Sequence, residues 1–215
     1  MPRRNAPKSV IKRLPVYLRI LDNLIRRDVE IISSRVLSEE TGFTAEQIRK
    51  DLAYFGAFGT RGTGYNTSYL REKLLRIIGL DKQTKLVVIG AGHLGKALSR
   101  YNITKNPYVE IVAIFDASPA EVGSQIEGKE IRPMEELSDV IEEHNIKVAM
   151  VTVPAEPAQV VVDQLVENGI TAILNFAPTK LHVPDSVHVH NADLTIELQS
   201  LIYYSLEDEK HKTAE

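Results

Sequence analysis

Three glycines with the spacing G-x-G-x-x-G, Gly90, Gly92 and Gly95, directly follow the apolar run at residues 86–89. We expect that run to form a buried strand and the residues after it to form a helix. The first glycine then allows a tight turn, the second lets a pyrophosphate approach the backbone, and the third lets the helix pack closely on the sheet. The helix N-terminus faces the phosphates. The spacing therefore predicts a Rossmann-like domain that binds a dinucleotide.

An acidic residue, Asp116, ends a second apolar run, 21 residues after Gly95. In dinucleotide-binding units an acid at about this distance bonds the ribose hydroxyls, and its charge repels a 2′-phosphate. The sequence therefore favours NADH and NAD+ over their phosphorylated forms. Within the glycine loop Ala91, His93 and Leu94 are also expected next to the nucleotide.

Composition and periodicity predict an α/β chain with two domains. After residue 85 short apolar runs alternate with amphipathic segments, which is typical of β-α units in a parallel sheet. Residues 1–80 have helical periodicity and hold 15 Lys and Arg against 8 Asp and Glu, whereas residues 81–215 hold 11 against 21. This asymmetry suggests that only the first segment meets a polyanion. We predict domains at 1–80 and 84–206, followed by a polar tail at 207–215.

The first domain contains a helix-turn-helix pattern. Ser33 or Ser34 is positioned to cap a short helix that ends at Gly42, and Thr44 followed three residues later by Gln47 forms a capping box for the next helix. The second helix should turn its apolar residues inward and present side chains suited to base edges and phosphates. The predicted DNA contacts on and beside it are Thr44, Gln47, Arg49, Lys50 and Tyr54.

A glycine-rich segment follows this helix. Gly59, Gly62 and Gly64 permit a tight hairpin with Arg61 and Tyr65 at or near its tip. An arginine at such a tip is suited to the minor groove of DNA. The first domain is therefore predicted to be a winged helix, with Arg61, Gly62 and Tyr65 as further DNA contacts.

Several classes of site are disfavoured. The absence of cysteine removes disulfides, thiolate metal sites and cysteine nucleophiles, and it fits a cytoplasmic protein. No apolar run approaches the roughly 18 residues of a membrane span. His188 and His190 alternate without a nearby third metal ligand, and the Y-x-x-x-K pair Tyr101 and Lys105 follows Gly95 too closely for a catalytic pair. We therefore predict no metal, no membrane contact and no catalytic residue.

Five segments together resemble the Rex family of bacterial redox-sensing transcriptional repressors: RLPVYLRIL, IRKDLAYFGAFGTRGTGYN, VIGAGHLGKAL, VTVPAEPAQ and GITAILNFAP. The resemblance implies an N-terminal winged helix, a Rossmann-like domain and a C-terminal helix exchanged within a homodimer. It also implies release from operator DNA when NADH rises relative to NAD+. His93, in the variable middle of the loop, leaves open how the pyrophosphate is held.

The resemblance assigns further residues. Asp116 falls at the family's ribose-binding acid and residues 90–95 at its phosphate loop. Segments VTVP and NFAP border the nucleotide, so Val153, Pro154, Asn175 and Phe176 are expected to contact it. Arg19, Tyr101 and Asp193 are expected at the interface that changes between states.

Two other interpretations of the second domain remain open. The second domain is also compatible with an NAD-dependent oxidoreductase that carries an accessory helical domain. Its late segments VTVPAEPAQ and GITAILNFAP also resemble the CoA-binding domain of succinyl-CoA synthetases, so a CoA- or nucleotide-binding module is the second alternative.

Overall fold

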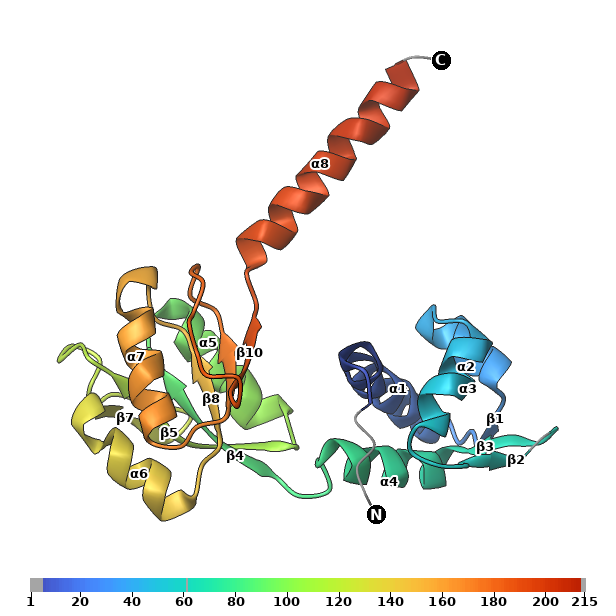
Figure 1. The fold of residues 1–215 in the computed structure, drawn as a ribbon, viewed down its shortest axis with the longest axis horizontal. Coiled ribbons are helices and arrows are strands. Elements are labelled where there is room, and N and C mark those ends of the chain that lie inside the picture. The colour runs from blue at the N-terminus through green and yellow to red at the C-terminus, as the bar shows by residue number, and fades with distance from the viewer. Residues whose placement is uncertain (1–5, 61, 214–215) are drawn as a thin grey trace. The chain divides into compact units, whose positions relative to one another are not determined.

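The computed structural model describes the backbone of residues 6–60 and 62–213 and the side chains of these residues up to 206. The chain divides into two compact units, Met1–Lys82 and Gln83–Glu215. The first unit contains α1 (Lys8–Arg26), β1 (Ile31–Ile32), α2 (Ser34–Thr41), α3 (Ala45–Ala53), β2 (Gly59–Thr60), β3 (Gly64–Asn66) and α4 (Thr67–Ile78) (Figure 1). Its three short strands pair antiparallel in the order β1-β3-β2. The unit is a winged helix-turn-helix, as predicted.

The caps of α2 and α3 are formed by the side chains that the sequence indicated. The Ser33 hydroxyl accepts a hydrogen bond from the backbone N–H of Val36 at 3.2 Å, and the Thr44 hydroxyl accepts one from that of Gln47 at 3.2 Å. Gly42 ends α2 in the left-handed conformation with φ of 75°. These local bonds set where α3 begins, and so which of its residues face inward.

A buried ion pair joins α3 to α1. Asp51, 2% exposed, accepts two hydrogen bonds from the Arg13 guanidinium at 2.6 and 2.7 Å and one from the Tyr17 hydroxyl at 2.6 Å. Burial alone would raise the pKa of the Asp51 carboxyl, but the hydrogen bonds from Arg13 and Tyr17 outweigh it and hold the pKa below its ordinary value. The ionised network therefore orients α3 on the body of the unit.

The second unit is built on a seven-stranded sheet. Its strands are β4 (Thr84–Ile89), β5 (Val109–Asp116), β6 (Gln125–Ile126), β7 (Lys129–Pro133), β8 (Val148–Val151), β9 (Ala172–Asn175) and β10 (His188–Asn191). They lie in the order β10-β9-β8-β4-β5-β7-β6, all parallel except the edge strand β6. The helices are α5 (His93–Lys105), α6 (Leu137–His144), α7 (Ala155–Glu167) and α8 (Leu194–Thr213), with a short 3-10 turn at Met134–Glu136.

Side chains from β4 enter the cores on both faces of the sheet. Val87 and Ile89 pack with apolar residues of α6 and α7, whereas Leu86 and Val88 pack with those of α5. Both faces of the strand are thus covered, which explains why it is a continuous apolar run. From β4 the chain runs outward through β5 and β7 and then returns to β8 on the other side of β4. This reversal creates a crevice beyond the carboxyl ends of β4 and β8.

Helix α8 extends further than the sequence indicated. The segment from residue 207, expected as a polar tail, continues the helix as far as Thr213. Across the described residues, none of the helices is both apolar and long enough to cross a bilayer.

Candidate functional site

A pocket of about 470 Å³ opens at the crevice between β4 and β8. It is lined by the glycine loop, the end of β5, the segment after β8 and the residue after β9. The predicted nucleotide contacts among its lining residues are Gly90, Gly92, His93, Leu94, Asp116, Val153, Pro154 and Phe176. The structure thus brings together residues that are up to 86 positions apart in the chain.

The three glycine positions of the loop differ in what an added side chain would meet. Gly90 has φ of 100°, which favours glycine, and a Cβ at Gly95 would lie 1.9 Å from the Gly90 carbonyl oxygen. A Cβ at Gly92, by contrast, would meet no other described atom within 4 Å. Gly90 and Gly95 are therefore needed for the turn and for helix packing, while Gly92 leaves open space where a pyrophosphate can approach the start of α5.

The carboxylate of Asp116 is held over the loop. Its Oδ2 accepts a hydrogen bond from the Ala91 N–H at 2.5 Å, and its Oδ1 accepts one from the Ser118 N–H at 2.7 Å. A carboxylate has about four acceptor positions, so two remain for ligand hydroxyls. Asp116 can therefore accept from both hydroxyls of a ribose while the loop stays in place.

Three predicted nucleotide residues do not line this pocket. Ala91 is buried in the turn after β4, Gly95 is buried in the first turn of α5, and Asn175 is only 1% exposed. The Asn175 side-chain amide donates to the Asn191 side chain at 2.9 Å and to the Ala177 carbonyl at 3.1 Å. Asn175 therefore organises the end of β9, and the direct contact expected of it does not fit its burial.

Thr152 lines the pocket but was not among the contacts predicted from the sequence. Its hydroxyl lies 2.7 Å from the Gly90 carbonyl oxygen and 3.0 Å from that of Ile89, and it donates its proton to these acceptors. This contact joins the end of β8 to the glycine loop at residues 90–95. The signal was present in the segment VTVP, where a hydroxyl residue stands between two apolar ones at a strand end.

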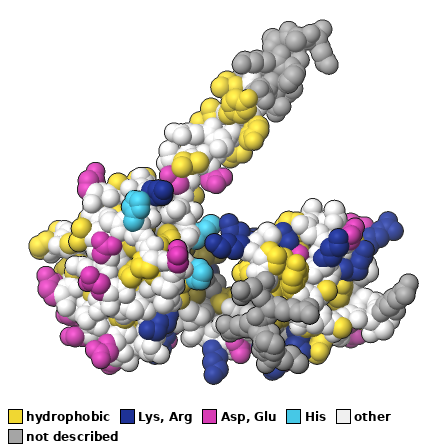
Figure 2. Space-filling view, viewed as in Figure 1, with side chains coloured by type: hydrophobic (Ala, Val, Ile, Leu, Met, Phe, Trp, Pro, Cys, Tyr) yellow, Lys and Arg dark blue, Asp and Glu magenta, His cyan; other side chains and the backbone are white. Residues whose placement is uncertain are grey.

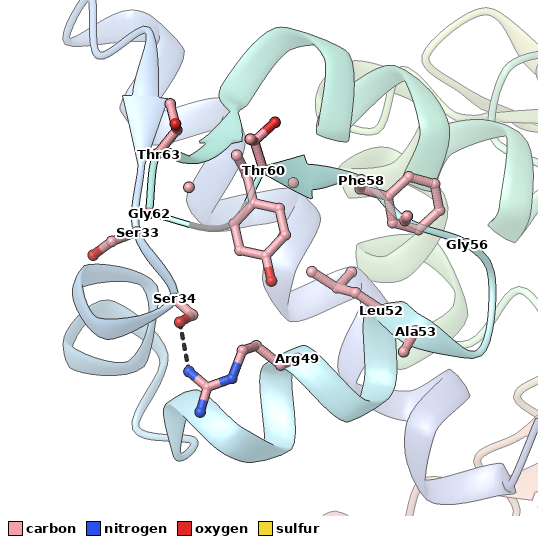
Figure 3. Close-up of a pocket in the computed structure, with 14 residues that line it drawn as sticks. Ser33, Ser34, Arg49, Leu52, Ala53, Gly56, Phe58, Thr60, Gly62 and Thr63 are labelled. Carbon is pink, nitrogen blue, oxygen red and sulfur yellow. Dashed lines mark hydrogen bonds between the residues drawn. The ribbon is translucent and has the colours of Figure 1, made fainter.

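The predicted DNA-binding side chains on and beside α3 are exposed or half-buried, and the two cations among them have partners. Lys50 Nζ pairs with Glu46 Oε1 at 2.7 Å, and Arg49 Nη1 donates to the Ser34 hydroxyl at 2.8 Å (Figure 3). Exposed pairs of this kind contribute little free energy. Both cations can therefore exchange their present partners for phosphates or bases. Thr44 and Tyr54 are exposed, and Gln47 is half-buried.

A groove of about 600 Å³ runs between α3 and the wing, which is the hairpin of β2 and β3. Arg49 lies on one wall of the groove and Gly62 on the other. Figure 3 shows Leu52, Phe58 and Thr60 around it. Tyr65, predicted at or near the wing tip, is the second residue of β3 and lines this groove, but it is only 9% exposed and its ring packs in the core over Gly59. Arg61 lies outside the described residues.

The predicted interface residues differ in their surroundings. Arg19 and Tyr101 are exposed, whereas Asp193 is half-buried and caps α8, accepting from the N–H groups of Thr195 at 2.9 Å and Ile196 at 3.1 Å. Helix α8 carries a run of exposed hydrophobic side chains (Figure 2). They are Leu194, Ile196, Leu198, Leu201, Ile202, Tyr203, Tyr204 and Leu206, each at least 50% exposed.

Histidines and acids do not gather into a metal centre in the part of the chain that the structure describes, where no group of three possible ligands occurs. His188 and His190 are both exposed on β10.

Two family models match parts of the chain. One, described as "CoA binding domain", matches residues 81–179, and the other, described as "Putative DNA-binding protein N-terminus", matches residues 5–53. The two matches fall in the second and first units respectively.

Whole-chain comparisons give longer matches. The redox-sensing transcriptional repressor Rex of Natranaerobius thermophilus is 61% identical, covering 96% of this chain and 94% of its own length. That of Clostridium beijerinckii is 45% identical, covering 96% and 98%. Among solved structures, RSP, a Rex-family repressor, in complex with β-NAD+ and operator DNA is 40% identical with a TM-score of 0.90, covering 98% of this chain and 97% of that one. RSP in complex with β-NADH is 39% identical with a TM-score of 0.86, covering 99% and 100%.

Proposed function

The chain belongs to the Rex family of redox-sensing transcriptional repressors, and we propose that it binds operator DNA through its winged helix and is released when NADH occupies its second unit. The observation that carries the nucleotide assignment is the arrangement of Asp116, Gly92 and the N-terminus of α5 around one pocket. It pairs a ribose acceptor with a phosphate site. RSP, a relative of the same architecture, was solved with β-NAD+ and operator DNA and with β-NADH.

The match to a CoA-binding family model gives a second candidate ligand. CoA carries a phosphate on its ribose, and the carboxylate of Asp116 would repel a phosphate at that position. NADH and NAD+ present two free hydroxyls there instead. This charge argument favours the dinucleotides over CoA.

The exposed hydrophobic side chains of α8 support a homodimer. Eight exposed hydrophobic side chains on one helix indicate a protein contact, and in a two-fold dimer each subunit can cover the helix of the other. We therefore propose that two copies exchange α8. A chain that ends at Ala192 should then be monomeric or aggregated by analytical ultracentrifugation, and a well-behaved dimer would refute the exchange.

In this proposal the nucleotide acts as a signal and undergoes no reaction. The protein acts in the cytoplasm, where it meets both DNA and the nucleotide. A ligand shifts a conformational equilibrium only through its different affinities for the states. NADH and operator must therefore favour different arrangements of the dimer. By linkage, operator must weaken NADH binding by the same factor by which NADH weakens operator binding.

The test is a pair of NADH titrations, with and without a saturating operator duplex, at fixed salt because DNA affinity depends steeply on salt. Allosteric couplings are typically about 1 to 3 kcal/mol, or roughly 5- to 150-fold, so NADH affinity should fall by a factor in that range. NAD+ and CoA serve as comparison ligands. Equal NADH affinities in the two titrations would contradict the sensor, and tighter binding of CoA than of NADH would favour the second candidate.

A further inference from the structure

The side-chain amide of Asn175 links the nucleotide pocket to the strand that leads into α8. Its Nδ2 donates to Asn191 Oδ1 at 2.9 Å and to the Ala177 carbonyl at 3.1 Å, and its Oδ1 accepts from the Ala177 N–H at 3.0 Å. The group is 1% exposed. One buried amide thus bonds both to the turn after β9 and to the end of β10.

On the pocket side, the turn held by Asn175 carries Phe176, which lines the pocket together with Val153 and Pro154. The backbone N–H of Phe176 donates to the Val151 carbonyl at the end of β8 at 2.8 Å. A ligand that displaces Phe176 must therefore act on the residue next to Asn175.

On the other side, Asn191 lies opposite Asn175 in the parallel pairing of β9 and β10. The backbone repeats the connection, because the Ala192 N–H donates to the Asn175 carbonyl at 2.8 Å. The next residue, Asp193, caps α8. Only Ala192 separates the side-chain contact from the helix cap.

We propose that Asn175, through Asn191, is a positioning residue that couples occupancy of the nucleotide pocket to the placement of α8. This inference rests on the proposed function, because it assigns a route to the regulation of that site. The physical basis is the cost of leaving a buried amide unsatisfied. When the turn at Phe176 moves, Asn191 and the start of α8 move with it because the hydrogen bond is retained.

The experiment changes Asn191, an exposed residue, so that the buried member of the pair stays in place. Asn191→Ala removes the acceptor, whereas Asn191→Asp keeps an oxygen that can accept from Asn175. His188→Ala is the matched control, an exposed residue on the same strand. For each protein the coupling factor is the ratio of the NADH dissociation constants with and without saturating operator.

Substitutions along a coupling route change the coupling by about 2- to 30-fold. We expect Asn191→Ala to lower the coupling factor by that amount while the affinities of the free protein for NADH and for operator stay near wild type. Asn191→Asp and His188→Ala should keep the wild-type factor. An unchanged factor in Asn191→Ala, or equal losses in Asn191→Asp or His188→Ala, would overturn the proposal. Absence of coupling in the wild type would instead overturn the proposed function itself.

Discussion

The Asp116 carboxylate accepts a hydrogen bond from the backbone N–H of Ala91 at 2.5 Å, so the end of β5 is bonded directly to the glycine loop that follows β4. This contact holds the proposed ribose acceptor, Asp116, in fixed register with the proposed phosphate site at the start of α5. It also gives the carboxylate two roles, in the loop and toward the ligand.

Replacing Asp116 by alanine should weaken NADH binding and narrow the preference for NADH over NADPH. A hydrogen bond to a charged group contributes about 1.5 to 3 kcal/mol, so the affinity for NADH should fall roughly 10- to 150-fold. Isothermal titration calorimetry with both nucleotides measures this. Asp139→Ala, at an exposed acid on α6, is the control. Unmoved affinities for both nucleotides would place the ribose elsewhere.

The glycines of the loop should respond differently to alanine. At Gly95 the added methyl would lie 1.9 Å from the Gly90 carbonyl oxygen, so α5 must shift and Tm should fall. At Gly92 the backbone is extended and the methyl meets open space among the described residues, so Tm should stay near wild type. NADH binding should weaken in both variants. Thermal unfolding combined with calorimetry separates the two effects, and a stable Gly95→Ala protein that binds NADH normally would contradict the packing argument.

Lys50→Ala should weaken operator binding and leave NADH binding intact, because Lys50 projects from α3 and is exposed. A base contact contributes about 1 to 3 kcal/mol, and loss of a phosphate contact lowers the salt slope by about 1. Arg132→Ala removes a cation with the same i,i+4 pairing in the second unit, so it is the matched control. Fluorescence anisotropy at several salt concentrations gives both quantities. If Lys50→Ala keeps the operator affinity of the control, the assignment of α3 as the DNA-reading helix fails.

Asp51→Asn should destabilise the first unit by about 3 kcal/mol, because it leaves the Arg13 guanidinium without its buried counter-ion. The wild type should also lose stability in acid. The pKa of Asp51 is lowered in the folded state, so its contribution is complete above the unfolded pKa, near 3.8, and is lost as pH falls through the lower folded value.

Urea unfolding at neutral pH and at about pH 3 tests this, with denaturant midpoints compared between Asp51→Asn and wild type. The difference between the two proteins should shrink at the lower pH. An equal difference at both values would show that the charge of Asp51 contributes nothing to the stability of the unit.

Local patterns were sufficient to predict much of this protein. The caps at Ser33 and Thr44, the left-handed Gly42 and the glycine loop all depend on residues within a few positions of one another, so their physical causes are visible in the sequence. Composition and periodicity predicted the two domains, and the spacing from Gly95 located the acid at Asp116; the resemblance to the Rex family agreed with both. The strand-turn-helix predicted from the glycine spacing is present, and Gly90 and Gly95 each answer a steric demand of it, whereas Gly92 leaves open space.

Tertiary structure decided what depends on distant partners. Tyr65 is in the core because β3 pairs with β1 and β2 and turns its ring inward, and no local pattern specifies that pairing. Thr152 and Gly90 are 62 positions apart in the chain, and the hydrogen bond between them forms only because β8 lies beside β4 in the sheet. Asn175 was expected beside the nucleotide from the resemblance to the Rex family, but its amide is bonded to β10 in the fold. The period of the hydrophobic residues and the spacing of motif residues determine local structure, because both act between neighbours in the chain. The direction in which a polar side chain points depends instead on which strand packs beside it.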